Sequence, residues 1–175
     1  MLDVRSHVQP ALAGRYHVSL AVDDREIREA QHLRYRVFAG EMGARLSSVL
    51  PEHDIDLYDP FCDHLLVREL VSGEVVGTYR ILPPDAAQRV GSYYSEQEFD
   101  LTRLNFLRPR MAELGRSCVH PAHRTGAVIA RLWMGLADYM TRCGYEYVVG
   151  CASIGMADGG HLAASVYRQL TERHL

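Results

Sequence analysis

Apolar positions along the chain follow two different spacings, and their order predicts a mixed fold. Alternating or short continuous apolar runs predict strands at residues 16–22, 64–70, 75–82, 111–119 and 145–151. Apolar residues at helical spacing predict helices at about 23–38, 127–142 and 161–173. Strands and helices in this order are typical of an α/β (α+β) sandwich, in which helices cover a central sheet.

Each predicted helix carries a stripe that we expect to face the sheet. Asp23 and Glu26 form a capping signal at the start of the first helix, and Gly144 is placed to end the second. The three stripes are Ile27, Ala30, Arg34 and Val37, then Ile129, Leu132, Trp133, Leu136 and Met140, and last Leu162, Val166, Tyr167 and Leu170.

The chain of 175 residues suits one domain with a core of its own. We expect a flexible leader at residues 1–14 and a single domain at 15–175. Residues 40–61 are irregular and rich in acids, and connections of this length are usually functional. Residues 85–108 are ambiguous, since Ser95–Glu98 fits the start of a short helix and Phe99–Leu104 fits a strand.

Charge and composition exclude several function classes. The formal net charge is −3, which argues against a nucleic-acid partner because such proteins usually carry a basic excess. All 19 basic residues are arginine, which excludes Schiff-base lysines and lysine-type phosphate loops. The four cysteines lack metal-ligand spacing, so we expect no metal, reduced thiols and a cytoplasmic location. No apolar run is long enough to span a bilayer, so contact with a membrane would be peripheral.

The turn between the strand at 111–119 and the helix at 127–142 is a candidate phosphate site. Free backbone N–H groups and the helix dipole favour an anion at such a helix start. Gly126 permits close approach to the backbone, and Arg124 adds a fixed positive charge. The alternative is an ordinary strand–helix turn that contains a glycine.

Glu113 and Arg116 are a candidate catalytic pair on one predicted strand. Residues three apart on a regular strand face opposite sides of the sheet. A functional pair therefore requires a bulge between them, and Gly115 is the natural place for it. The alternative is a structural ion pair on a sheet face.

Acidic and basic side chains gather around the irregular segment. An α-amino acid carries a carboxylate and ammonium groups, so both signs of charge are needed to recognise it. The alternative is a solvated acidic loop held by salt bridges, and the spacing lacks the later Gly and Glu of a calcium loop. The charged residues concerned are Asp54, Asp56, Asp59, Arg34, Arg36 and Arg80.

Several segments together resemble one enzyme family. The bacterial L-ornithine N-acyltransferases, which have the GNAT acetyltransferase fold, are similar to this chain in one continuous stretch. That stretch is Glu113-Leu-Gly-Arg116-Ser-Cys118-Val-His120-Pro121, followed by Arg124-x-Gly126. The resemblance spans residues 33–172, and the same skeleton resembles the acyl-homoserine lactone synthases. The further matching segments are Leu33-Arg34-Tyr-Arg36-Val-Phe38-x-x-Glu41, Asp54-x-Asp56-x-Tyr58-Asp59, Cys62-Asp-His64, Val76-Gly-Thr-Tyr-Arg80 and Ser153-Ile-Gly-Met156-x-Asp158.

The resemblance implies a GNAT-like fold whose central mixed sheet is splayed between strands 111–119 and 145–151. Helices would cover both faces, and further strands beyond residue 175 would complete the sheet. It also implies an acyl-phosphopantetheine thioester as co-substrate, carried by acyl carrier protein or coenzyme A, and no permanently bound cofactor.

The resemblance further implies a role for each candidate residue. Glu113 would act as base or ammonium anchor, Arg116 would orient it, and Tyr167 would protonate the leaving thiolate. The implied donor-binding residues are Arg124, Thr125, Gly126, Ala127, Cys118 and Val119. The implied acceptor-binding residues are Arg34, Phe38, Asp54, Asp56, Asp59 and Arg80.

The expected function is transfer of a 3-hydroxy long-chain acyl group from acyl carrier protein to the α-amine of L-ornithine, the first step of ornithine lipid synthesis. The acidic carrier protein would meet arginines near the entrance, and the inner membrane would be touched from the cytoplasm. The alternatives are an acyl-homoserine lactone synthase or another N-acyl amino acid synthase. An alternative of another class is a non-catalytic module that binds acyl carrier protein. The entrance arginines are Arg108, Arg110, Arg124 and Arg131.

Overall fold

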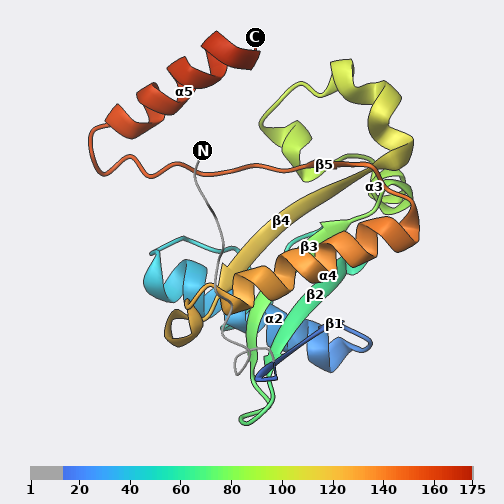
Figure 1. The fold of residues 1–175 in the computed structure, drawn as a ribbon, viewed down its shortest axis with the longest axis vertical. Coiled ribbons are helices and arrows are strands. Elements are labelled where there is room, and N and C mark those ends of the chain that lie inside the picture. Colours follow the sequence, from blue (N-terminus) through green and yellow to red (C-terminus); the bar gives the residue numbers. More distant parts are fainter. Residues whose placement is uncertain (1–13, 175) are drawn as a thin grey trace.

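A five-stranded mixed sheet forms the centre of the computed structural model, which describes residues 14–174 (Figure 1). The leader expected at residues 1–14 therefore lies outside the described residues, apart from Gly14. The strands lie side by side in chain order, antiparallel from the first to the fourth, and the fifth runs parallel to the fourth. They are β1 (Tyr16–Leu20), β2 (Asp63–Glu69), β3 (Val75–Leu82), β4 (Met111–Val119) and β5 (Tyr147–Val149).

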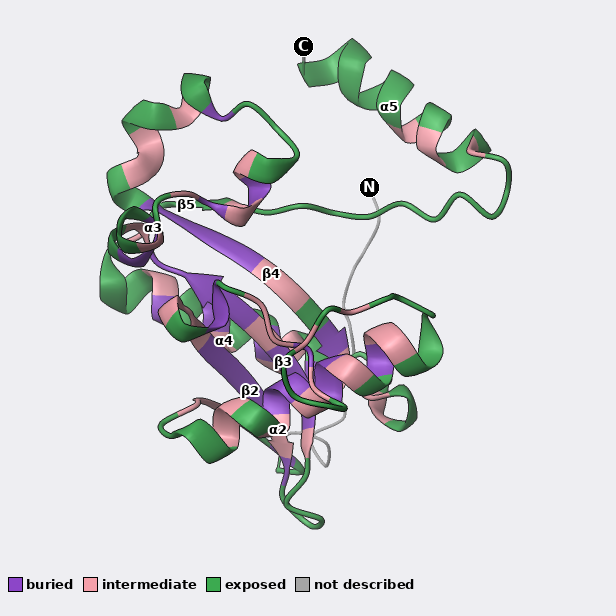
Figure 2. Cartoon of the chain, turned by 180° about the vertical axis from the view of Figure 1, so that it is seen from behind, coloured by how far each residue is buried: buried purple, intermediate pink, exposed green. Residues whose placement is uncertain are grey.

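Helices α2 (Asp24–Tyr35) and α4 (Ala127–Cys143) cover opposite faces of this sheet (Figures 1 and 2). The predicted capping signal starts α2, because the Asp23 carboxylate accepts a hydrogen bond from the Glu26 N–H at 2.9 Å. Within residues 14–174 no helix combines the length and apolar character needed to cross a bilayer. The other helical elements are the π-helical η1 (Arg36–Glu41), the 3₁₀ turns η2 (Asp59–Phe61), η3 (Tyr94–Gln97), η4 (Thr102–Arg110) and η5 (Pro121–His123), α3 (Pro84–Val90) and α5 (His161–His174).

The main core lies between α4 and the sheet. The apolar stripe that α4 turns toward the core differs from the predicted one, because Ile129 and Trp133 are 38% and 53% exposed. A Cβ added at Gly135 would lie 2.7 Å from Val18 Cγ2, so the helix backbone touches the sheet along the line through Gly135. Trp133 lies at the edge of this contact, half exposed, with its ring centre 6.2 Å from that of Tyr79. The buried positions of α4 are Val128, Leu132, Leu136 and Tyr139.

Strands β4 and β5 are paired over three residues and then separate. β4 continues to Val119, whereas β5 ends at Val149 instead of the expected residue 151. A Cβ at Gly150 would lie 2.4 Å from the Leu114 carbonyl oxygen, so the two backbones still touch where they part. The splay predicted between these two strands is confirmed.

The structure settles one ambiguous segment and contradicts one expectation. Residues 99–104 form no strand, because η4 begins at Thr102 and packs Leu104 against an apolar cluster beside α3. The stripe expected on the last helix does not face the core, since Leu162, Tyr167 and Leu170 are 56%, 69% and 53% exposed. Figure 1 shows α5 apart from the sheet, so the helical period is present but the sheet surface it would cover is not beneath it.

Candidate active site

A bulge in β4 places the predicted pair on one face of the sheet. The pairing of β3 with β4 shifts after Gly115, where two residues of β4 oppose one of β3. Arg116, inside the bulge, has a φ of +53°, an uncommon conformation for a residue other than glycine. The extra residue reverses the alternation of side chains, so Glu113 and Arg116 line the same pocket. The predicted bulge is confirmed, with the left-handed residue at Arg116 and not at Gly115.

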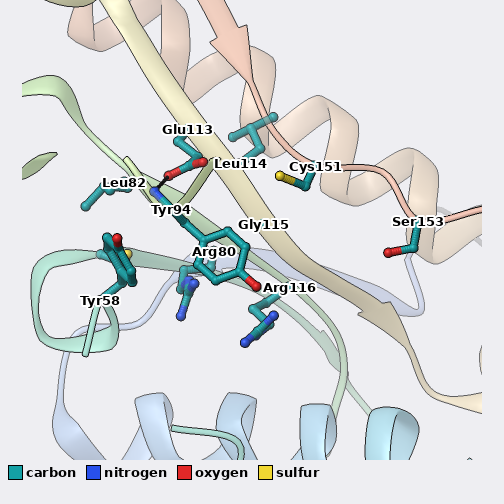
Figure 3. Close-up of a pocket in the computed structure, with 11 residues that line it drawn as sticks. Tyr58, Arg80, Leu82, Tyr94, Glu113, Leu114, Gly115, Arg116, Cys151 and Ser153 are labelled. Atoms are coloured by element: carbon teal, nitrogen blue, oxygen red, sulfur yellow. Dashed lines mark hydrogen bonds between the residues drawn. The ribbon is translucent and has the colours of Figure 1, made fainter. Parts of the chain in front are cut away.

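The pocket lies where β4 and β5 part, and its cavity volume is about 120 Å³ (Figure 3). Side chains from five parts of the chain line it. They come from β3, from β4, from the segment before β2, from the segment around η3 and from the residues after β5. The gap between the parted backbones therefore opens into a space lined by charged and hydroxyl groups. The lining residues are Tyr58, Cys62, Arg80, Leu82, Tyr94, Glu113, Leu114, Gly115, Arg116, Cys151 and Ser153.

Glu113 is 4% exposed and is held by three donors from η3. Its carboxylate accepts hydrogen bonds from the Tyr94 N–H at 2.6 Å, the Ser95 N–H at 2.7 Å and the Ser95 hydroxyl at 2.5 Å. Charge-assisted bonds of this kind are short and strong. A carboxylate has about four acceptor positions, so these three donors leave one for a ligand in the pocket.

Arg116 pairs with the acids of the predicted acceptor cluster. Its Nε lies 3.1 Å from Asp54 Oδ2, and its Nη2 lies 3.4 Å from Asp56 Oδ2. Its guanidinium carbon also lies 5.4 Å from the centre of the Tyr94 ring, a cation–π geometry. Tyr94 therefore links the pair, since its N–H holds Glu113 and its ring supports Arg116. The orienting role expected of Arg116 stays a prediction.

Three members of the charged cluster, Arg34, Asp54 and Asp59, form its inner half and are buried beside α2. The Arg34 side chain has no exposed surface, and it lies 3.0 Å from Asp54 Oδ2 and 2.7 Å from Asp59 Oδ1. Removing one partner from such a buried pair leaves an uncompensated charge, which is strongly destabilising. Arg34, Asp54 and Asp59 line no part of the pocket. Their side chains pair with one another behind the pocket, and the direct contact with an acceptor expected of them stays a prediction.

Three further members, Asp56, Arg80 and Arg116, form the outer half of the cluster and lie at the pocket. Asp56 bridges two pocket arginines, at 2.7 Å from Arg80 Nη1 and 3.4 Å from Arg116 Nη2. Burial opposes ionisation of Asp56, but the two guanidinium groups and the Tyr58 N–H outweigh it, so the pKa of Asp56 lies below its usual value. Of the predicted acceptor residues, Arg80 lines the pocket and Asp56 lies directly against it.

Two neutral groups lie beside these charges. Burial lowers the pKa of His64, whose Nε2 lies 3.2 Å from the Asp59 carbonyl oxygen. Burial also raises the pKa of the Cys62 thiol to about 12. Near neutral pH the charge at this site therefore comes from arginines and carboxylates.

The candidate phosphate loop precedes α4 as predicted. Gly126 is the N-cap of the helix, with a φ of +83°, and no side chain caps the helix start. The Arg124 guanidinium contacts both oxygens of Glu41, at 2.6 and 2.7 Å, and this hydrogen bonding lowers the pKa of Glu41. The pair is exposed, and exposed pairs add little stability, so a phosphate can compete with Glu41. Thr125 is exposed, whereas Ala127 packs against the main core.

The remaining predicted site residues lie outside the pocket lining. Cys118 is buried with Leu33 and Val37 of α2 and η1, Phe38 packs against that cluster, and burial raises the pKa of the Cys118 thiol to about 12. The Val119 carbonyl accepts a hydrogen bond from Arg124 Nε at 3.1 Å. Phe38, Cys118 and Tyr167 do not line the pocket.

The residues that hold or face Glu113 were not predicted from the sequence. Tyr94 and Cys151 line the pocket, and Ser95 donates a hydrogen bond to the Glu113 carboxylate. One local signal exists, because the Glu96 side chain accepts from the Tyr93 N–H at 2.7 Å and so starts η3. That signal indicates a short helix, but not which strand the helix will lie against.

Comparison with known proteins gives the family. The sequence model of the acetyltransferase (GNAT) domain family matches residues 33–134. An L-ornithine N(alpha)-acyltransferase of Rhodobacter capsulatus is 41% identical over 152 residues, which are 82% of this chain and 58% of the relative. The enzyme of the same name from Brucella abortus is 40% identical over 80% of this chain and 53% of the relative. The chain thus spans about half the length of the curated relatives it matches.

Solved structures agree on the fold. The acyl-homoserine lactone synthase LasI has a TM-score of 0.60 at 22% identity, covering 87% of this chain and 77% of LasI. The synthase BjaI, whose structure contains S-adenosylmethionine and isopentyl-CoA, has a TM-score of 0.61 at 21% identity, covering 86% of this chain and 72% of BjaI. With a family model that matches more than half of its residues, a splayed mixed sheet and these neighbours, the chain belongs to the GNAT acetyltransferase family.

Proposed function

We propose that this chain transfers an acyl group from a phosphopantetheine thioester to the α-amine of an amino acid, and that the acceptor is L-ornithine. The observation that carries the proposal is the position of Glu113, which lies in a charged pocket at the point where β4 and β5 part. The names of relatives at 40–43% identity support ornithine as the acceptor.

The donor arm would lie along the open edge of β4. Beyond Glu113, the described part of β5 no longer pairs with β4, so backbone N–H and C=O groups of β4 can bind the amides of pantetheine. The path from Gly115 to Val119 measures about 13 Å at the usual rise of a strand. It leads toward Arg124 and the start of α4, where free N–H groups suit a phosphate.

The acceptor would occupy the charged side of the pocket. Its carboxylate would bind Arg80 and Arg116, which both line the cavity. Its α-amine would lie at the free acceptor position of Glu113, which takes a proton as the amine attacks the thioester carbonyl. Backbone N–H groups near the bulge would stabilise the oxyanion. The rate enhancement would come mainly from this positioning.

We further propose that acyl carrier protein brings the donor and that the reaction takes place in the cytoplasm at the inner membrane. Arg110 and Arg124 are exposed and carry single acidic partners, Glu146 and Glu41, so an acidic carrier can exchange with them. Phe106 is 75% exposed, and an exposed aromatic ring suits peripheral contact with lipid.

A thiol-release assay tests the proposal. The chain is incubated with 3-hydroxyacyl-carrier protein and with ornithine, other amino acids or S-adenosylmethionine, and the products are identified by mass spectrometry. Ornithine-dependent release with N-acylornithine as product supports the proposal. Release with S-adenosylmethionine alone would identify a lactone synthase, and binding of the carrier without release would identify a non-catalytic module.

Replacement of Glu113 tests its role in the transfer. Glu113→Gln keeps the size of the side chain, and its amide oxygen can still accept from the two Ser95 donors, although its NH2 group cannot accept from the Tyr94 N–H. The change removes the base, so turnover should fall about 100-fold or more. Binding of the carrier protein, measured by titration, should stay unchanged and serves as the control for folding. Full turnover of the variant would contradict the role.

A further inference from the structure

The transfer needs a proton at the leaving thiolate, and the expected donor is not at the pocket. Tyr167 is 69% exposed on α5 and does not line the cavity. The space between the parted strands is lined by a different proton carrier. Cys151 follows Gly150, where the backbones of β4 and β5 separate, and it lines the same cavity as Glu113 and Gly115.

A chain of hydrogen bonds joins this thiol to the carboxylate. Cys151 Sγ lies 3.4 Å from Ser95 Oγ, and Ser95 Oγ lies 2.5 Å from Glu113 Oε1. The thiol donates to the hydroxyl, and the hydroxyl donates to the carboxylate. Ser95 is 2% exposed, so its hydroxyl is shielded from bulk water. Figure 3 shows Cys151 and Glu113 on either side of the β4 backbone at the pocket.

We propose that Cys151 is a further catalytic residue, which donates a proton to the leaving pantetheine thiolate and recovers one from Glu113 through Ser95. This inference rests on the proposed acyl transfer. Ser95 is the positioning residue of the relay, because its hydroxyl connects the other two groups.

The proton released by the amine and the proton taken up by the thiolate balance without an external acid. The neutral amine forms a bond to the thioester carbonyl carbon, and the carbon–sulfur bond to pantetheine breaks. The proton lost by the amine goes to Glu113, and the departing thiolate takes the proton of Cys151. The Cys151 thiolate then accepts the Ser95 proton while Ser95 accepts that of Glu113. The net result moves one proton from the amine to the released thiol.

The test compares two leaving groups. An alkyl thiolate, such as pantetheine, needs a proton as it leaves, whereas an aryl thiolate is stable without one. Cys151→Ala should therefore lower turnover of the pantetheine thioester about 100-fold and that of an aryl thioester less than about threefold. Ser95→Ala, which keeps the backbone N–H to Glu113, should show the same dependence. Cys151→Ser retains an exchangeable proton and should recover part of the loss.

Cys143→Ala is the matched control, because Cys143 is also exposed but lies at the end of α4, outside the pocket. Equal losses with both donors in Cys151→Ala, or no loss, would overturn the inference while leaving the acyl transfer intact. A leaving-group dependence in Tyr167→Phe and not in Cys151→Ala would assign the proton to Tyr167 instead.

A measurement without turnover separates the relay from the proposed function. In the Cys143→Ala background, iodoacetamide should react first with Cys151, because burial raises the pKa of Cys62 and Cys118 to about 12. Removing the charge of Glu113 by Glu113→Gln should make the Cys151 thiolate easier to form and speed alkylation at least about threefold. An unchanged rate would overturn the relay even if the chain showed no transferase activity.

Discussion

Replacement of Gly150 by alanine tests whether a backbone contact sets the separation of β4 and β5. The added Cβ would lie 2.4 Å from the Leu114 carbonyl oxygen, whereas ordinary contacts begin at 3.4 Å. The contacted atom belongs to the backbone, so no side-chain rotation relieves the clash. The two backbones must therefore move apart by about 1 Å, which is an overpacking change.

The magnitude follows from that displacement. Overpacking of this kind lowers the free energy of unfolding by about 1–3 kcal/mol. Leu114, which makes the contact, and Cys151, which follows Gly150, both line the pocket. A displacement of about 1 Å near reacting groups costs about 100-fold in rate. We expect both losses in Gly150→Ala, the first in urea unfolding and the second in thiol release.

Gly155→Ala is the control for this experiment. A Cβ at Gly155 would meet nothing within 4 Å, so the variant should keep the stability and the rate of the parent chain. A Gly150→Ala protein with unchanged stability and turnover would refute the argument that this contact sets the splay.

Two further predictions concern the buried charges and the buried histidine. Arg34→Met removes the fully buried cation that Asp54 and Asp59 share, and leaves them only the more distant Arg116 and Arg80 contacts. The free energy of unfolding should therefore fall by about 3–5 kcal/mol in denaturant titrations, and a loss below about 1 kcal/mol would show that Arg116 and Arg80 suffice to neutralise the two acids. Because burial lowers the pKa of His64 in the folded chain, the unfolded chain takes up the proton first as the pH falls below about 6.5. Stability should then decrease with falling pH by up to about 1.4 kcal/mol per pH unit, and His64→Gln should remove this part of the slope. Equal slopes in the two proteins between about pH 6.5 and 5 would contradict this assignment.

Much of the fold could be predicted because its signals are local. The Asp23–Glu26 cap starts α2 where the sequence indicates, and the strand periods locate β2, β3 and β4 to within about two residues. The bulge in β4 could also be predicted, because Glu113 and Arg116 cannot share a face of a regular strand. In each case the physical cause lies within a few neighbouring residues.

The candidate site could be predicted only in part. Glu113, Arg116 and Arg80 line the pocket as expected, but the burial of Arg34 depends on how α2 lies against the sheet. Ser95 and Cys151 escaped prediction because they meet Glu113 through irregular segments whose path no local pattern determines. Tyr167 shows the opposite case, since its helical period exists but its helix does not pack where the period suggests.

The sequence by itself determined the order of elements and the charged residues from which the site is built, whereas the splayed strand pair was implied by the family resemblance. The order of elements and the choice of charged residues follow from the spacing of side chains and from the chemistry each side chain can perform. The tertiary structure alone decided which charges neutralise one another, which face the cavity, and that a serine and a cysteine from distant segments meet the central carboxylate. The reason is that burial and pairing are properties of contacts between segments far apart in the chain, and such contacts exist only once the sheet and its helices have packed.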